Sequence, residues 1–383
     1  MCVINSKIKI LYLLRKFDIG GAETFLLSLV KLLRDKYQIK VVSLYNGGIL
    51  QREFEALGIS TTCAGFGHLF DFKSYYRLIK ILRQFSPDIL HTKLVHADLV
   101  GRLAGRVGNV PVVLSTVENA HEWENLKGLK GIIKAMTYRY TLLLNKGKVI
   151  PVSFHIASLL EKKCNIHKDI IEVIENAVDT KYYAPCSIDN TKALRKKFGI
   201  EADCFCVGVI GTLSPIKDHK TFLEAASRII QRIENTRFLI VGRGNVGELQ
   251  RYCKQLGIAN SVLFLGPRRD IRDILCMLDV FVLSSLSEGL SMTLLEAMSM
   301  QKGVVVTAVA GNRRLVTHGK TGFLVKPQHP HELAAKVLEL LEDRKLLEQL
   351  GAEAQKFVTT KYDISIACQA YHALYQKMLG ASI

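Results

Sequence analysis

The 383-residue sequence lacks several features that would place it in a specialised class. It has no run of about 18 consecutive apolar residues, so no segment is predicted to cross a membrane as a helix. Its first residues hold only a short apolar run before Arg15 and no small-residue cleavage site, so we expect no signal peptide. None of the nine cysteines belongs to a CxxC pair, and their odd number and scattered positions favour free thiols in a reducing cytoplasm.

Acidic residues are scarce relative to basic ones. The chain carries 52 Lys and Arg against 35 Asp and Glu, a formal net charge of +17. Residues 1–150 alone carry 22 basic against 11 acidic side chains. This imbalance favours an anionic partner such as a membrane surface or a phosphorylated lipid. The sequence has no recognition element typical of nucleic-acid-binding proteins, so nucleic acid is not an expected partner.

The composition and the hydrophobic pattern predict an α/β protein of two domains. Apolar residues make up 49% of the chain and charged residues 23%, which is typical of a globular protein too long for one core. Short β-branched runs alternate with amphipathic helical stretches, as in doubly wound parallel sheets with crossover helices. The expected strands are Ile8–Leu14, Ile39–Leu44, Asp88–Thr92, Val110–Thr116, Lys148–Val152 and Ile170–Ile174, then Phe205–Ile210, Arg237–Val241, Ser261–Leu265, Val280–Ser284, Gly303–Thr307 and Gly322–Val325.

The domain boundary is predicted where the periodic pattern stops. We expect a Rossmann-like domain over residues 1–175, a linker over residues 176–190 and a second Rossmann-like domain over residues 191–360. A helix over residues 361–383 is expected to pack back on the first domain. Two such domains in tandem face a cleft, and ligands usually bind at such a crevice.

A glycine motif suggests one possible ligand. Residues 242–247 read GRGNVG, a literal GxGxxG between a predicted strand and a predicted helix. The next strand ends in Arg268 and Arg269 where an acidic residue would hold a ribose, and two arginines suit a 2′-phosphate. The position of this motif argues against a dinucleotide site. It follows the second predicted strand of its domain, whereas the dinucleotide fingerprint normally follows the first strand.

Two glutamates suggest another ligand. Glu288 and Glu296 are eight residues apart, at a point where a strand breaks at a glycine and enters a helix. Backbone N–H groups at the start of a helix attract anions such as a diphosphate. A nearby carboxylate can accept hydrogen bonds from sugar or ribose hydroxyls. The spacing by itself is common and does not distinguish this site from a solvated helix face.

The span from about Gly211 to Pro327 resembles the donor domain of retaining glycosyltransferases of family 4, which have the two-domain GT-B fold. The matching stretches are IGTLSPIKDH (210–219), FLIVGRG (238–244), LFLGPRRDIRDIL (263–275) and SEGLSMTLLEAM (287–298), the last being the family's glutamate–seven–glutamate motif. Weaker similarity covers IENAVD (174–179) and GGAE (20–23).

The resemblance implies a role for each matching residue. Glu288 would contact the transferred sugar, Glu296 the ribose hydroxyls, and Lys217 the diphosphate, whose charge it would neutralise. The resemblance implies no metal and no cofactor, since the lysine and helix N-termini meet the phosphate charge. Backbone amides would hold phosphate or sugar oxygens at Ser291, Met292 and Thr293, and at Gly20 and Gly21 in the first domain.

Several positions depart from the family pattern, and two of them, Thr212 and Glu118, stand where the family contacts the donor. Thr212 stands where the family commonly has an arginine facing the phosphates, and Arg243, Arg268 or Arg269 is the expected substitute. Glu118 stands where the family often has a histidine that contacts the donor sugar, so Glu118 is a candidate catalytic residue.

One segment of the first domain suits a membrane. Residues 125–160 hold six basic residues, from Lys127 to Lys148, and no acidic one, with apolar and aromatic residues between them. Such a segment suits the interface of an anionic membrane. The alternative is a helix packed in the core with one solvated basic face. The resemblance favours the membrane, since many family members extend lipid-linked saccharides at its cytoplasmic face.

The sequence therefore predicts a metal-independent retaining glycosyltransferase. It would move a hexosyl or N-acetylhexosaminyl unit from a nucleotide sugar, UDP-linked, to a lipid-linked or oligosaccharide acceptor in surface polysaccharide or glycoconjugate synthesis. We expect it in the cytoplasm, peripheral on the inner face of the cell membrane. Three alternatives remain at this point: a nucleotide-sugar epimerase on the same scaffold, an NADP-dependent oxidoreductase using residues 242–247, and a non-catalytic membrane-bound scaffold.

Overall fold

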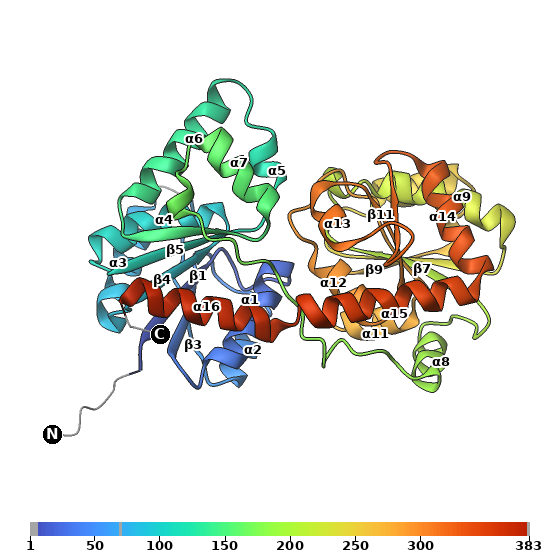
Figure 1. Ribbon diagram of the computed structural model, residues 1–383, viewed down its shortest axis with the longest axis horizontal. Helices are drawn as coiled ribbons and strands as arrows, with labels where there is room; N and C mark the ends of the chain where they lie inside the picture. Colours follow the sequence, from blue (N-terminus) through green and yellow to red (C-terminus); the bar gives the residue numbers. More distant parts are fainter. Residues whose placement is uncertain (1–6, 69–70, 381–383) are drawn as a thin grey trace. The chain divides into compact units, whose positions relative to one another are not determined.

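The chain forms two compact units. The computed structural model describes residues 7–68 and 71–380 (Figure 1). One unit comprises Met1–Asn176 with Ile364–Ile383, and the other comprises Ala177–Asp363. Residues 1–6 and 381–383 of the predicted first domain and terminal helix lie outside the described residues. Each unit is a six-stranded parallel sheet with helices on both faces, so the predicted α/β class is confirmed.

The first unit has the strand order β3-β2-β1-β4-β5-β6. Its chain passes from β1 to β2 and β3 on one side and then returns to β4 on the other, so the order reverses between β1 and β4 (Figure 1). The strands are β1 Lys9–Leu14, β2 Gln38–Ser43, β3 Ser60–Cys63, β4 Ile89–Lys93, β5 Val112–Val117 and β6 Gly147–Pro151; the helices are α1 Gly21–Leu33, α2 Gln51–Ala56, α3 Phe72–Phe85, α4 Val95–Val107, α5 His121–Glu124, α6 Gly128–Leu143, α7 Phe154–Cys164 and α16 Ile364–Leu379.

The two faces of the first sheet bury different partners. Leucines and valines of β1, β2 and β4 form one core with α3 and α4. On the other face α16 lies beside α1, with the rings of Phe25 and Tyr371 in contact. The Tyr375 hydroxyl is 2.8 Å from both the Tyr12 hydroxyl and His91 Nδ1, and all three side chains are buried. These hydrogen bonds satisfy buried polar groups and attach the last helix to the sheet.

The second unit has the strand order β12-β11-β10-β7-β8-β9. Here the order reverses between β7 and β10, which pair in parallel. In open α/β sheets, ligands bind outside the carboxyl ends of the strands at such a reversal. The strands are β7 Phe205–Ile210, β8 Thr236–Val241, β9 Val262–Gly266, β10 Val280–Leu283, β11 Gly303–Thr307 and β12 Phe323–Val325; the helices are α8 Ile188–Lys197, α9 His219–Arg232, α10 Gly247–Gln255, α11 Ile271–Met277, α12 Met292–Ser299, α13 Ala310–Leu315, α14 Pro330–Glu342 and α15 Arg344–Lys361.

Two details of the predicted strands are wrong. Residues 168–170 form a 3-10 turn, and Ile171 makes a single bridge to Val149 in place of the expected strand Ile170–Ile174. Strand β3 was not expected, because its sequence STTC lacks an apolar run and it lies at the edge of the sheet, where burial is partial.

The segment predicted as a linker, residues 176–190, lies almost wholly in the second unit, and α8 begins within it.

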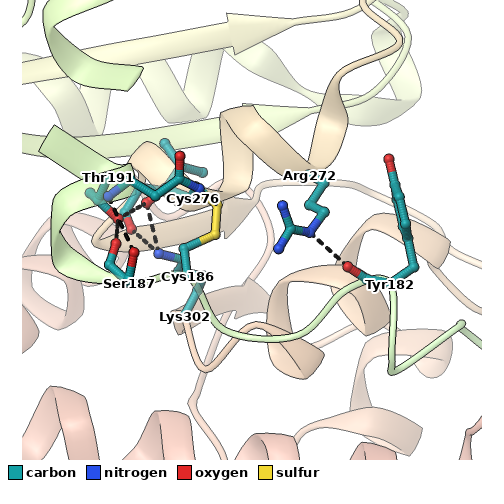
Figure 2. The surroundings of a disulfide bond; sticks show 9 residues. Tyr182, Cys186, Ser187, Thr191, Arg272, Cys276 and Lys302 are labelled. Atoms are coloured by element: carbon teal, nitrogen blue, oxygen red, sulfur yellow. Dashed lines mark hydrogen bonds between the residues drawn. A yellow bond between two sulfur atoms is a disulfide. The ribbon is translucent and has the colours of Figure 1, made fainter. Parts of the chain in front are cut away.

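The cysteines are not all free. A disulfide joins Cys186, just before α8, to Cys276 in α11 (Figure 2). The expectation of free thiols is wrong for this pair, because residues 90 apart in sequence are brought together by the packing of α8 against α11. Within the described ranges, no helix combines the length and the apolar content that crossing a membrane requires.

Candidate active site

The loops that follow β7 and β10 are held together at the carboxyl edge of the second sheet. After β7 the chain makes a 3-10 turn, Pro215–Lys217, and enters α9. After β10 it passes through buried Ser284 and Ser285 and enters α12. Ser284 Oγ donates to the Lys217 carbonyl at 2.9 Å, and the Leu286 amide donates to the Ile216 carbonyl at 2.8 Å. These bonds fix the two loops beside each other.

Lys217 and Glu288 meet at this junction. Lys217 Nζ lies 2.6 Å from Glu288 Oε1, and Ser285 Oγ donates to the same oxygen at 2.6 Å. The Glu288 side chain is 8% exposed and that of Lys217 is 20% exposed. An ion pair sheltered from water is screened less than a surface pair. The structure therefore brings together two of the predicted site residues, with Ser285 as a third that the sequence analysis missed.

The start of α12 adds hydrogen-bond donors to the same edge. Ser291 caps the helix, its side chain accepting from the Leu294 amide, and Thr293 Oγ1 donates to the Ile210 carbonyl at 3.3 Å. The first helical amides, near Met292, have no partners within the helix, so this end carries partial positive charge. A lysine and a helix N-terminus together form a site suited to an anion.

Several buried polar atoms around the junction have no hydrogen-bond partner among the described residues. They are Ser214 Oγ and Ser287 Oγ, one on each loop, and Glu296 Oε2 on α12. Buried polar atoms are nearly always paired, so unpaired ones require an explanation such as a bound ligand or ordered water. Their clustering on the two loops and α12 indicates that this edge of the sheet accommodates a polar molecule.

Glu296 lies deeper than Glu288. Its side chain projects from α12, the residue is 6% exposed, and burial raises the pKa of its carboxyl to about 8. The Tyr183 hydroxyl beside this carboxyl opposes part of that rise in pKa. Sequence reasoning missed Tyr183, since nothing in the sequence relates it to a residue more than 100 positions away.

The glycine turn after β8, residues 242–247, packs closely against the loop that follows β7. A Cβ on Gly242 would lie 1.7 Å from the Gly211 carbonyl oxygen, and one on Gly244 would lie 2.5 Å from the Leu213 Cβ. Both glycines have φ near +150°, which side chains rarely adopt. Because the loop after β7 fills the space beside these glycines, the dinucleotide interpretation of residues 242–247 is not supported.

The expected arginines lie on the neighbouring turns. Arg243 belongs to the glycine turn, where its carbonyl accepts from the Leu213 amide at 2.8 Å. Arg268 follows β9 and forms a bidentate pair with Asp270, at 2.8 Å through Nε. Thr212 is exposed at the end of β7.

Three expected residues lie in the first unit, Gly20 and Gly21 after β1 and Glu118 directly after β5. Gly20 caps α1 after β1, and Gly21 is the first residue of that helix. A Cβ on Gly20 would lie 2.5 Å from Glu23 Oε2, so the carboxylate of the helix's first turn occupies this space. Burial, together with the charge of Glu118, raises the pKa of Glu23 to about 7.

Glu118 is held by a buried lysine that the sequence analysis missed. Lys93 Nζ, at the end of β4, lies 3.0 Å from Glu118 Oε1, with side chains 1% and 8% exposed. Asn176 Nδ2 donates to the other carboxylate oxygen at 3.3 Å. The signal available in the sequence was a lysine ending an otherwise buried strand, which requires a partner when it is desolvated.

Exposed apolar residues gather on α6. This helix buries Tyr138 and Leu142, while apolar side chains along its length remain in contact with solvent, namely Leu129, Ile132, Ile133, Met136, Tyr140 and Leu143. Basic residues of the same helix lie between them. The alternative of a core-packed helix with only a basic face in solvent therefore does not fit α6.

Family models match both halves of the chain. The model described as Glycosyltransferase Family 4 matches residues 19–182, and that described as Glycosyl transferases group 1 matches residues 204–343. The UDP-Gal:alpha-D-GlcNAc-diphosphoundecaprenol alpha-1,3-galactosyltransferase of Escherichia coli is 30% identical over 98% of each chain. The N,N'-diacetylbacillosaminyl-diphospho-undecaprenol alpha-1,3-N-acetylgalactosaminyltransferase of Campylobacter jejuni is 25% identical over 80% of this chain and 81% of that one.

Solved structures share the fold. Anabaena HepE, in complex with UDP and glucose, has a TM-score of 0.85 at 22% identity and covers 97% of this chain and 100% of its own. WaaG, a glycosyltransferase involved in lipopolysaccharide biosynthesis, has a TM-score of 0.76 at 15% identity, covering 96% of this chain and 99% of its own. At these identities the likeness concerns the GT-B fold alone.

The raised pKa of Glu296 makes stability depend on pH. Below about pH 4.5 the carboxyl is neutral in both the folded and the unfolded state; as pH rises toward 8 only the unfolded state ionises, so stability is lost. We expect Glu296→Gln and the natural protein to unfold alike at about pH 4, and the variant to be more stable by a few kcal/mol at pH 8.5. Urea titrations at both pH values measure this. If the free energy of unfolding changed equally with pH in the two proteins, the assigned burial of the ionisable Glu296 carboxyl would be contradicted.

Proposed function

Because this chain belongs to glycosyltransferase family 4, we propose that it transfers a hexosyl or N-acetylhexosaminyl unit from a UDP-linked sugar to a lipid-linked or oligosaccharide acceptor. The observation that carries the proposal is the contact of Lys217 with Glu288 beside the N-terminus of α12. The UDP-galactose in the name of the Escherichia coli relative supports a UDP-linked donor. Anabaena HepE, which shares the fold, has been solved in complex with UDP-glucose, and this also supports a UDP-linked donor.

In the proposed reaction the chain stabilises a departing diphosphate. Negative charge grows on the diphosphate as the glycosidic bond breaks, and Lys217 with the amides of Ser291–Thr293 would meet that charge. Glu288, held by Lys217 and Ser285, would contact the sugar hydroxyls near the reacting carbon. Glu296 would accept hydrogen bonds from the ribose. Since a lysine and a helix end supply the positive charge, the proposed transfer needs no metal ion.

We propose retention at the anomeric carbon. UDP-hexoses such as UDP-galactose carry an α-linked sugar, and both bacterial relatives form alpha-1,3 linkages according to their names. The names of the same two relatives contain an undecaprenol-diphosphate acceptor, which supports a lipid-linked acceptor for this chain. A capsular polysaccharide glycosyltransferase of Staphylococcus aureus, 22% identical over 82% of each chain, agrees with a role in surface polysaccharide or glycoconjugate synthesis.

We propose further that the first unit docks on the cytoplasmic face of an anionic membrane through α6. Its exposed apolar side chains and basic residues are the combination that binds such an interface. Each basic residue near the surface contributes about 1 kcal/mol. A lipid-linked acceptor would then be reached from the membrane surface.

Loss of either member of the ion pair should remove most turnover. We expect Lys217→Ala and Glu288→Gln each to lower kcat/KM by about 100-fold or more, the usual effect of removing one transition-state contact. Lys220→Ala is the matched control, because Lys220 is three residues on, exposed and paired with Glu248. Transfer of radiolabelled sugar from a UDP-linked sugar to a polyprenyl-diphosphate-linked acceptor, with release of UDP, measures the rates with and without a chelator. Unchanged rates in either site variant would refute the site, and loss of activity with the chelator would refute metal independence.

The membrane proposal has its own test. Leu129→Ser with Ile133→Ser should weaken binding to vesicles containing phosphatidylglycerol about 10-fold or more, because two apolar side chains no longer enter the interface. Ile188→Ser, which changes an exposed isoleucine of α8 in the second unit, should leave binding unchanged. Vesicle co-sedimentation measures both. Equal binding by all three proteins would contradict docking through α6.

A further inference from the structure

Three buried charged side chains lie at the carboxyl edge of the first sheet. Lys93 is the last residue of β4, Glu118 follows β5 directly, and Glu23 lies in the first turn of α1, which follows β1. The side chains of Lys93 and Glu118 are 1% and 8% exposed, and Glu23 is also buried. The strand order reverses between β1 and β4, and open α/β sheets bind ligands outside the carboxyl ends of their strands at such a reversal. The three side chains therefore lie where this sheet is expected to receive a ligand.

Contacts from two elements hold the Lys93 ammonium. Its Nζ lies 3.0 Å from Glu118 Oε1. From α1, the Ala22 carbonyl accepts from Nζ at 3.4 Å, and the centre of the Phe25 ring lies 4.7 Å away. The face of an aromatic ring attracts a cation at this distance. The ammonium is thus fixed between α1 and the end of β5, and it fixes the Glu118 carboxylate in turn.

The two carboxylate oxygens of Glu118 differ in their partners. Oε2 accepts a hydrogen bond from Asn176 Nδ2 at 3.3 Å. Oε1 is close to the lysine but accepts no bond of hydrogen-bond geometry from the described residues. Buried acceptors are nearly always paired, so an unpaired one points to a donor from a ligand or from ordered water. Because Lys93 and Asn176 hold the carboxylate, Oε1 is oriented before such a donor arrives.

The charge around these groups suits an uncharged ligand. Burial raises the pKa of Glu23 to about 7, and the charge of Glu118 adds to that rise while that of Lys93 opposes it. A Cβ on Gly20 would lie 2.5 Å from Glu23 Oε2, so this carboxyl folds back on the start of α1, where helix amides would otherwise attract an anion. Two carboxyl groups beside one ammonium disfavour a phosphate at this edge. A hydroxyl group, in contrast, donates to a carboxylate without bringing charge.

We propose that Glu118 Oε1 accepts a hydrogen bond from a hydroxyl of the acceptor saccharide, and that Lys93 is the positioning residue that holds Glu118 for this contact. The inference rests on the proposed function and names groups of the first unit that bind its acceptor. Hydroxyls of the donor sugar have the same chemistry, but in the proposed function they are met by Glu288 of the second unit. A donor-sugar contact, which the family resemblance implies at the position of Glu118, is the alternative outcome of the test.

A purely structural ion pair predicts a different result from a pair that binds substrate. Burying two charges costs solvation that their attraction barely offsets, so neutral replacements of both partners are usually tolerated. Lys93→Met combined with Glu118→Gln removes both charges and keeps side chains of similar size. We expect this double variant to fold, with a melting temperature close to that of the natural protein. A structural pair would also leave the kinetics unchanged, whereas the proposed contact would be lost.

Initial rates of transfer test the proposal, with the UDP-linked sugar and polyprenyl-diphosphate-linked N-acetylglucosamine varied separately. Glu118→Gln and the double variant should each raise the KM for the acceptor about 10-fold or more, because a hydrogen bond to a charged group is lost, and leave the KM for the donor nearly unchanged. Glu172→Gln is the matched control, since Glu172 also lies 3.0 Å from a lysine, Lys148, and should change neither KM. An unchanged acceptor KM, or a rise in the donor KM alone, overturns the inference.

The role of Lys93 is tested by its coupling to Glu118. Because Lys93 acts through Glu118, Lys93→Met should raise the acceptor KM as Glu118→Gln does, and the double variant should show no larger rise than either. Lys93→Met leaves a buried carboxylate without its cation, which is strongly destabilising, so Lys93→Gln takes its place if that variant does not fold. A natural acceptor KM in the folded Lys93 variant, or additive effects in the double variant, overturns the role of Lys93.

A failure of the proposed function would look different, because the natural protein would then transfer no sugar. Binding of free N-acetylglucosamine, followed by saturation-transfer NMR without any nucleotide, tests the inference in that case. We expect the signal of the natural protein to weaken in Glu118→Gln and to stay unchanged in Glu172→Gln. Signals of equal strength in the natural protein and Glu118→Gln, or none in either, would overturn the inference.

Discussion

The contact between Lys217 and Glu288 depends on the pairing of two parallel strands. β7 and β10 are 70 or more positions apart in sequence but adjacent in the sheet, so their carboxyl ends release two loops at the same edge. The Ser284–Lys217 and Leu286–Ile216 hydrogen bonds then fix the loops, and the 2.6 Å ion pair follows from that placement. A change of register in β10 would shift the start of the following loop, and with it Ser285 and Glu288, relative to the lysine.

Burial gives the two glutamates of the motif different properties. Glu288 has a lysine and a serine within 2.6 Å, so its charge is compensated inside the protein. Glu296 has only the Tyr183 hydroxyl described beside it, and burial raises its pKa to about 8. The first glutamate thus has its polar partners within the protein before any ligand arrives, while the second gains most from hydroxyl donors that a ligand would bring. This difference agrees with the separate roles proposed for the sugar and the ribose.

The sequence predicted the parts of the fold that depend on local pattern. Buried strands such as Val280–Leu283 and Gly303–Thr307 are mostly apolar runs. Glu288 and Glu296 were predicted as site residues because residues 287–298 resemble a contiguous family motif. The missing parts depend on contacts between distant residues. Tyr183 reaches Glu296, Cys186 reaches Cys276 and Lys93 reaches Glu118 only after the sheets have formed, and none of these pairs has a local signature. The edge strand β3 was missed because its polar sequence relies on pairing with β2.

The most direct measurement of the central claim is a crystal structure of this protein with UDP bound. We expect diphosphate oxygens within about 3.2 Å of Lys217 Nζ and of the amides that begin α12, with the ribose hydroxyls at Glu296. Density for the nucleotide at the glycine turn of residues 242–247, with the Lys217–Glu288 pair untouched by phosphate, would contradict it.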